Sequence, residues 1–152
     1  VGSEMCIRDR MNILYRGDGI VILDDTYNAN PQSMRAAISV LSDRRSQWSI
    51  AVLGDMFELG PFAPALHTGV GECLGKARID CLVAVGELAE HIAQGARNSG
   101  VPLVYHCKDK AEAKPVLDQL VRPGSTILVK ASRGMELEEL TAYLLSITPE
   151  AE

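Results

Sequence analysis

The sequence lacks several patterns that would assign it to a common functional class. Its four cysteines form no C-x-x-C pair and show no cysteine and histidine spacing typical of zinc ligands. This argues against a zinc site or a disulfide framework and favours a reducing cytoplasm. Basic residues are outnumbered, with 15 Lys and Arg against 20 Asp and Glu and a formal net charge of −5. Because phosphate backbones need clustered Lys and Arg, the balance argues against nucleic acid or an anionic membrane as partner.

Long apolar runs and the signatures of self-contained catalysis are also missing. No stretch of about 18 apolar residues and no signal-peptide core occurs, so we expect neither a membrane span nor export. No G-x-G-x-x-G follows a predicted strand, and G-x-S-x-G and H-E-x-x-H are absent. The segment Gly71–Lys76 resembles a phosphate loop, but it has one residue too few between its glycines and no Ser or Thr after the Lys.

The composition that remains is that of one globular domain with a core, since 47% of the 152 residues are hydrophobic and 23% are charged. The stretch Ile20–Pro31 organises it. An apolar run ends in two carboxylates, Asp24 and Asp25, and an Asn-rich turn and a Pro follow, an order typical of a ligand site in an α/β domain. Residues 1–10 lack periodicity, so we predict a non-native leader, a domain at 11–148 and a tail at 149–152.

Hydrophobic periodicity predicts a β-hairpin followed by alternating strands and helices. The predicted strands span residues 11–15, 20–23, 49–53, 81–85, 103–106 and 126–129. Helices are expected over 31–41 with Asn30 as N-cap, 67–77, 88–96, 111–121 and 135–145. Pro115 should kink the fourth helix or shift its start. The predicted fold class is α/β: a Rossmann-like three-layer domain with about six strands, mostly parallel, an opening hairpin and helices on both faces.

Polar residues follow the predicted strands, and the carboxyl ends of parallel strands meet at one edge of a sheet. The residues expected there are Asp24, Asp25, Thr26, Asn28, Asn30, Asp55, Glu58, Gly86, Lys130, Ser132 and Arg133. The two adjacent aspartates point to opposite faces if the strand persists, so at most one faces a ligand, where it could accept ribose hydroxyls or approach a cation. A turn or capping role is the alternative. Any α/β domain has such an edge, so it indicates only a ligand site.

Three groups of residues could contact a ligand. Asn28 and Asn30 could pair with an adenine edge through their amides, or could act only as turn and cap residues. The run from Lys130 to Arg133 lies between a buried strand and a helix N-terminus, which suits a carboxylate or a phosphate, although a solvated loop gives the same pattern. His67 could contact a substrate or could simply cap a helix.

Three ordered motifs resemble the C-terminal domain of the Mur ligases. They are LDDTYNANPQSM at 23–34, LGDMFELG at 53–60 together with His67, and VKASRG at 129–134. The resemblance covers residues 11–146 and is greatest to the family members that add D-Ala-D-Ala to UDP-MurNAc-tripeptide. It implies a parent protein with a UDP-sugar domain, a central ATPase domain and this C-terminal domain.

The resemblance implies an ATP-dependent peptide ligase of cytoplasmic peptidoglycan precursor synthesis. The family uses ATP and Mg²⁺ to form an acyl phosphate on the growing peptide, which an incoming amine attacks. The phosphate loop, the activating lysine and the metal ligands would belong to the central domain, so the isolated chain is expected to be inactive. This domain would swing over the central one and contribute positioning and charge compensation.

The resemblance also assigns roles to single residues. Those lining the nucleotide would be Asp25, Asn28 and Asn30, with the aspartate facing the ribose. Those facing the incoming dipeptide would be Lys130, Ser132 and Arg133, which would hold its carboxylate, and Asp55, Glu58 and His67 in a closing loop, where one acid could attract its ammonium group. The family also has a Gly-Arg pair before the domain. Here Asp9 replaces the Gly, and Arg10 is given no role.

A receiver-like phosphoacceptor signalling domain is the alternative from another class. The Asp24–Asp25 pair, Asp55 and Lys130 resemble its acidic pair, phosphorylated aspartate and lysine. Receivers, however, place a Ser or Thr where this chain has Gly86, and they have no Asn-rich turn. A third possibility is a degenerate nucleotide-binding domain with no catalytic partner, which a G-x-x-x-x-G-K-[ST] motif upstream in the parent gene would argue against.

Overall fold

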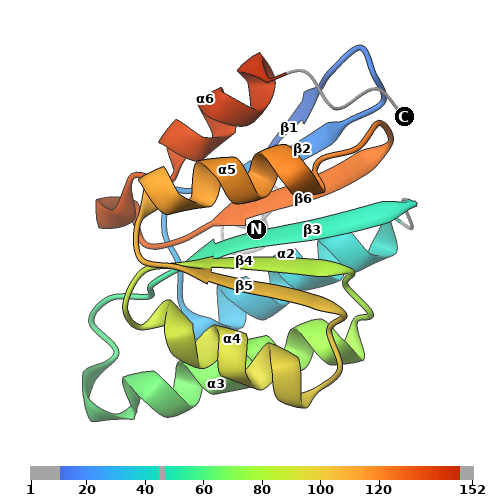
Figure 1. The fold of residues 1–152 in the computed structure, drawn as a ribbon. Coiled ribbons are helices and arrows are strands. Elements are labelled where there is room, and N and C mark those ends of the chain that lie inside the picture. The colour runs from blue at the N-terminus through green and yellow to red at the C-terminus, as the bar shows by residue number, and fades with distance from the viewer. Residues whose placement is uncertain (1–10, 45–46, 148–152) are drawn as a thin grey trace, which may run out of the picture.

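The computed structural model describes residues 11–44 and 47–147, so the predicted leader and tail lie outside the described residues. Within this part, six strands form one sheet in the order β1-β2-β6-β3-β4-β5 (Figure 1). The strands are β1 (Asn12–Tyr15), β2 (Val21–Asp25), β3 (Trp48–Gly54), β4 (Cys81–Val85), β5 (Leu103–Cys107) and β6 (Ser125–Lys130). Only β1 and β2 pair antiparallel, as the predicted opening hairpin.

Helices cover both faces of the sheet (Figure 1). They are α2 (Pro31–Asp43), α3 (Ala63–Lys76), α4 (Ala89–Asn98), α5 (Lys110–Leu120) and α6 (Glu138–Ser146), with the short 3₁₀ turns η1 (Gly60–Phe62) and η2 (Arg133–Met135). Side chains alternate along each strand, so Leu23 and Leu53 pack in a core with α2, α3 and α4, whereas Ile22 and Val52 pack in a second core with α5 and α6. The predicted three-layer α/β fold is confirmed.

The N-terminus of α2 is fixed by its own sequence. The Asn30 side chain accepts a hydrogen bond from Ser33 N at 2.8 Å, and Ser33 Oγ accepts one from Asn30 N at 3.0 Å, which completes a capping box. Pro31 occupies the first turn, where its missing N–H is not needed. The predicted apolar face is buried, and it consists of Met34, Ala37, Ile38 and Leu41.

Two helices, α3 and α6, begin at other residues than predicted. Helix α3 begins at Ala63 instead of His67, because η1 leads directly into it and Pro64 is tolerated in the first turn. Helix α6 begins only at Glu138, because Glu136 adopts a left-handed φ of 55° after η2 and interrupts the helix expected from Met135. The start of α5 is not shifted by Pro115, which lies inside the helix.

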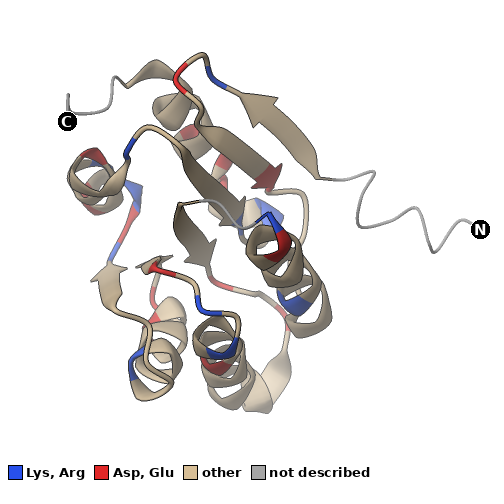
Figure 2. Ribbon diagram, turned by 90° about the vertical axis from the view of Figure 1, so that its right-hand side faces the viewer, with Lys and Arg blue, Asp and Glu red and all other residues tan. Residues whose placement is uncertain are grey.

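Charged residues lie mainly on helices and loops, and the strands are largely uncharged along their length (Figure 2). Asp25 ends β2 and Lys130 ends β6, and the parallel register places these two residues opposite each other. The carboxyl ends of β2, β6, β3 and β4 therefore form one continuous edge, which we call the carboxyl edge. It holds the predicted site residues.

Candidate functional site

A buried ion pair joins the ends of β2 and β6. The Lys130 Nζ atom lies 2.8 Å from Asp25 Oδ2 and donates a second hydrogen bond, also of 2.8 Å, to the backbone oxygen of Asn28. The Lys130 and Asp25 side chains are 2% and 6% exposed, so these charge-assisted contacts replace water around both charges. Lys130 thereby attaches the turn after β2 to the end of β6.

Asp24 faces the other side of the sheet, as the strand geometry predicts. Its Oδ1 accepts a hydrogen bond from Thr141 Oγ1 of α6 at 3.1 Å. It also borders a hollow of about 240 Å³ at the carboxyl edge, lined by Asn12, Asp24, Thr26, Tyr27, Arg133 and Glu138. One cation and two carboxylates therefore border the same small hollow.

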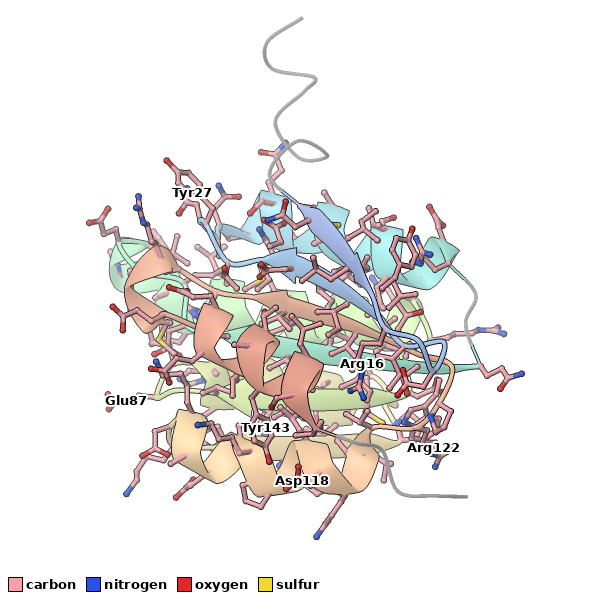
Figure 3. All side chains as sticks on the ribbon, turned by 90° about the horizontal axis from the view of Figure 1, so that it is seen from above. Arg16, Tyr27, Glu87, Asp118, Arg122 and Tyr143 are labelled. Atoms are coloured by element: carbon pink, nitrogen blue, oxygen red, sulfur yellow. The ribbon has the colours of Figure 1, made fainter. Side chains whose placement is uncertain are left out.

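The turn between β2 and α2 exposes two amides. The Asn28 Oδ1 atom accepts a hydrogen bond from Ala29 N at 2.9 Å, and the Asn30 side-chain oxygen caps α2. Both side chains are exposed, so their NH₂ groups are accessible at the surface. Tyr27, in the same turn, is 52% exposed and lies at the end of the molecule opposite Arg122 (Figure 3).

The loops after β3 and β6 are bonded to each other at the carboxyl edge. Ser132 N donates to the backbone oxygen of Asp55 at 3.0 Å, and Phe57 N donates to Ser132 Oγ at 2.8 Å. Ser132 and Asp55 are both buried. These two hydrogen bonds hold the loops in a fixed position relative to each other, and a shift of either loop would break both.

The Asp55 carboxylate binds the N-terminus of α4. Its Oδ1 accepts a 2.7 Å hydrogen bond from Ala89 N, where the helix dipole favours a negative charge. A Cβ atom at Gly86, whose φ is 118°, would lie 2.6 Å from the same oxygen, so glycine is required at that position. Asp55 is predicted to attract a substrate ammonium group, yet in this conformation its carboxylate is engaged within the domain.

His67 is fully buried, and both of its ring nitrogens are engaged. Met56 N donates to Nε2 at 3.0 Å, so the ring proton resides on Nδ1, which donates to the Ala63 oxygen at 2.7 Å. Burial lowers the pKa of His67 below its ordinary value of 6.5, and this effect outweighs the Ala63 carbonyl and Asp55, which raise it. The neutral ring thus ties the loop after β3 to α3.

Two predicted residues present charge at the surface of the carboxyl edge. The Arg133 guanidinium is exposed and lies 5.2 Å from the centre of the Tyr27 ring. Glu58 is exposed and adopts a left-handed φ of 64°. Phe57 and Phe62, in the same loop region as Glu58, are also exposed. The sequence analysis missed these two residues. The signal that could have found them is the presence of aromatic residues in a loop that contains glycine.

The described residues offer no evident place for a metal ion. Across 11–44 and 47–147, no three His, Cys, Asp or Glu side chains lie close enough together to hold one. Metal chemistry is therefore not assigned to these residues. In the same ranges, no helix is long and apolar enough to cross a membrane.

Comparison with protein families shows to which family this chain belongs. The model of a family described as "Mur ligase, glutamate ligase domain" matches residues 9–133. The chain belongs to this family. The match confirms the resemblance carried by the three motifs, all of which contribute residues to the carboxyl edge.

Two curated Mur ligases illustrate the relationship. The UDP-N-acetylmuramoyl-tripeptide--D-alanyl-D-alanine ligase of Bacillus subtilis is 34% identical over 138 residues, which cover 90% of this chain. The Escherichia coli ligase of the same name is 39% identical over 126 residues, or 82% of the chain. This chain spans 30% and 26% of the length of these two relatives.

Solved Mur ligase structures share the fold. MurF from Acinetobacter baumannii superposes with a TM-score of 0.82 at 36% identity, covering 91% of this chain and 30% of that one. The MurF ligase of Thermotoga maritima in complex with ADP gives a TM-score of 0.73 at 28% identity, covering 90% and 30%. A receiver-like signalling domain, the alternative prediction, finds no support in these comparisons.

Proposed function

We propose that this chain is the C-terminal domain of a cytoplasmic, ATP-dependent ligase of peptidoglycan precursor synthesis. The ligase would add D-alanyl-D-alanine to UDP-MurNAc-tripeptide through an acyl phosphate. The observation that carries the proposal is the 34% to 39% identity to ligases named for this reaction, over 82% to 90% of the chain. The domain would act by closing against the central ATPase domain of its parent chain.

The turn at residues 26–30 is the proposed nucleotide contact. The exposed amides of Asn28 and Asn30 can pair with an adenine edge, and the exposed Tyr27 ring offers a face for stacking. Asp25 would support the ribose contact chiefly through the shape of the turn, since its carboxylate already binds Lys130. The structure of the Thermotoga maritima relative in complex with ADP supports nucleotide binding by the parent ligase.

The loops after β3 and β6 are the proposed contact with the incoming dipeptide. The exposed guanidinium of Arg133 suits its carboxylate, and the exposed carboxylate of Glu58 suits its ammonium group. The other residues assigned to this substrate are buried and would hold the two loops in position without contacting the dipeptide. They are Lys130, Ser132, Asp55 and His67. ATP would bring Mg²⁺, whose ligands we assign to the parent chain outside the described residues.

A chimera tests the proposal. Residues 11–147 would replace the corresponding C-terminal domain of the Bacillus subtilis relative, and ADP release would be measured with ATP and UDP-MurNAc-tripeptide. We expect release that requires D-Ala-D-Ala, and none from the 152-residue chain alone. A chimera that folds but prefers another amino acid would contradict the substrate assignment. Substrate-dependent ADP release by the chain alone would contradict the assignment as a dependent domain.

A further inference from the structure

We propose that Lys130 is a positioning residue that acts on both substrates, because it locks the nucleotide-facing turn to the dipeptide-facing loop. The inference rests on the proposed function and deepens it. It differs from a direct contact between Lys130 and the dipeptide carboxylate, the role that the sequence suggests.

The contacts of Lys130 point inward. Its ammonium group binds Asp25 Oδ2 and the Asn28 oxygen, both at 2.8 Å, and the side chain is 2% exposed. Because the side chain is so deeply buried, a dipeptide carboxylate could reach Nζ only if the surrounding turn or loop moved away, which would disturb these two hydrogen bonds. The Asn28 contact matters most for positioning, since it fixes the backbone of the turn whose side chains face the nucleotide.

The same residue begins the loop that faces the dipeptide. Two residues later, Ser132 binds both Asp55 and Phe57 of the neighbouring loop through hydrogen bonds of 3.0 and 2.8 Å. One residue further, Arg133 lies over Tyr27, which is part of the nucleotide-facing turn. Turn and loop are thus joined twice, by the buried Lys130 contacts and by the exposed Arg133 and Tyr27 pair.

This arrangement has a kinetic consequence. If the Lys130 contacts are removed, the buried hydrogen bonds that attach Asp25 and Asn28 to β6 are lost, and the backbone around Asn28 and Ser132 can relax. A displacement of about 1 Å at a substrate-positioning group is enough to slow catalysis severely. Substitution of either Asp25 or Lys130 should therefore impair the binding of both ATP and D-Ala-D-Ala.

The test is a mutant cycle in the full-length ligase. Asp25→Asn, Lys130→Met and the double variant would be compared by the KM values for ATP and for D-Ala-D-Ala. We expect each KM to rise on the order of tenfold in every variant, with the double variant no worse than Lys130→Met alone. The double variant carries the test if Lys130→Met fails to fold, because removing both charges leaves no unpaired buried ion.

Lys110→Met is the matched control. Lys110 also binds a carboxylate and a backbone oxygen, Glu139 at 3.3 Å and Glu136 at 3.2 Å, but it does so near the surface of α5 and α6. Its loss should leave both KM values unchanged. A merely structural role for Lys130 would lower the amount of folded enzyme without changing the KM of the folded fraction.

Two results would overturn the inference. One is a rise in the KM for D-Ala-D-Ala alone, which would mark Lys130 as a direct substrate contact. The other is a folded double variant with both KM values unchanged. An inactive wild-type ligase would instead refute the proposed function. In that case, amide NMR spectra of the 152-residue chain test whether Lys130 links the turn to the loop after β6. Asp25→Asn should then shift the amide signals of residues 131–134. Unchanged signals would refute the link.

Discussion

At the scale of single residues, the polar side chains of the carboxyl edge fall into a buried group and an exposed group. Ser132, Asp55 and His67 are buried, and each hydrogen-bonds to the backbone of another segment. Arg133 and Glu58 are exposed and present their charges outward. Because a buried group that is already bonded cannot bind a ligand without losing a partner, the exposed residues are the better candidates for direct contact.

The first prediction concerns Arg133. In the full-length ligase, Arg133→Ala should raise the KM for D-Ala-D-Ala about tenfold and the KM for ATP less than about twofold, because a charge-assisted contact to the dipeptide carboxylate is lost. Arg122→Ala is the matched control: this guanidinium also lies over an aromatic ring, that of Trp48 at 3.5 Å, but at the opposite end of the molecule (Figure 3). Equal effects on both substrates would argue against the assigned role.

A second prediction concerns the neutral ring of His67. Its pKa is lowered by burial, so as the pH falls through 6.5 the unfolded chain takes up a proton while the folded chain does not. Stability present at pH 7.5 is therefore lost toward the lower folded pKa, by at most about 1.4 kcal/mol per pH unit. Asp55 and His91 are the charged groups that modulate this pKa.

Urea unfolding at pH 7.5 and 5.5 measures the effect. His67→Gln should reduce the loss of unfolding free energy on acidification, whatever its effect at pH 7.5. An unchanged pH dependence in His67→Gln would show that this ring does not contribute.

At the scale of elements, the start of α2 combines a structural and a proposed functional role in one residue. Asn30→Ala removes the cap and should lower the unfolding free energy by about 1 kcal/mol. Asn30→Asp keeps a capping oxygen but lacks the amide NH₂, so it should retain stability while the KM for ATP rises. Chemical unfolding together with ATP kinetics separates the two roles. Equal ATP kinetics in Asn30→Asp and the wild type would limit Asn30 to capping.

The α3 and α4 helices touch at glycine. A Cβ atom at Gly71 would lie 2.1 Å from the Ile92 oxygen, whereas one at Gly69 would meet only the flexible end of Arg35 at 3.2 Å. Gly71→Ala should therefore force the helices apart and lower the unfolding free energy by about 1 to 3 kcal/mol. Gly69→Ala should raise it by up to about 1 kcal/mol through helix propensity. Thermal unfolding of both variants measures the contrast, and similar changes would refute this packing.

At the scale of the whole molecule, the central sheet is shared by two cores. Val52 belongs to one core and Leu53 to the other, so neither core can form without the same strand. The single Trp48 reports on the α5 side, since its Nε1 donates to the Leu120 oxygen at 2.9 Å. We expect Trp fluorescence and far-ultraviolet circular dichroism to give the same urea midpoint. Separate midpoints would mean that the two layers unfold independently.

The exposed residues of the carboxyl edge include large hydrophobic side chains. They are Tyr27, Phe57 and Phe62. Exposed aromatic residues beside charged groups are typical of surfaces that contact a partner. The edge that carries the proposed substrate contacts is therefore also the surface proposed to meet the central domain.

Local sequence patterns were enough to predict the elements and the edge to which the site belongs. The hairpin, the face of α2 and the Asn30 cap follow from local periodicity and from side chains that bond within three residues, so no distant partner is needed. The parallel direction of the later strands followed from the alternation of strands and helices. Their order was not predicted, because the place of β6 between β2 and β3 depends on contacts between distant segments. The boundaries of α3 and α6 were not predicted either, because 3₁₀ turns at helix ends depend on how the loops pack.

Which polar residues are engaged inside the domain could not be predicted from the sequence and depends on the fold. The partner of Lys130 lies 105 residues away in the sequence, and that of the Asp55 carboxylate lies 34 residues away. Whether a charge is buried and paired, or exposed to a ligand, depends on such distant contacts, because the free energy of a charge is set by its surroundings and not by its neighbours in the chain.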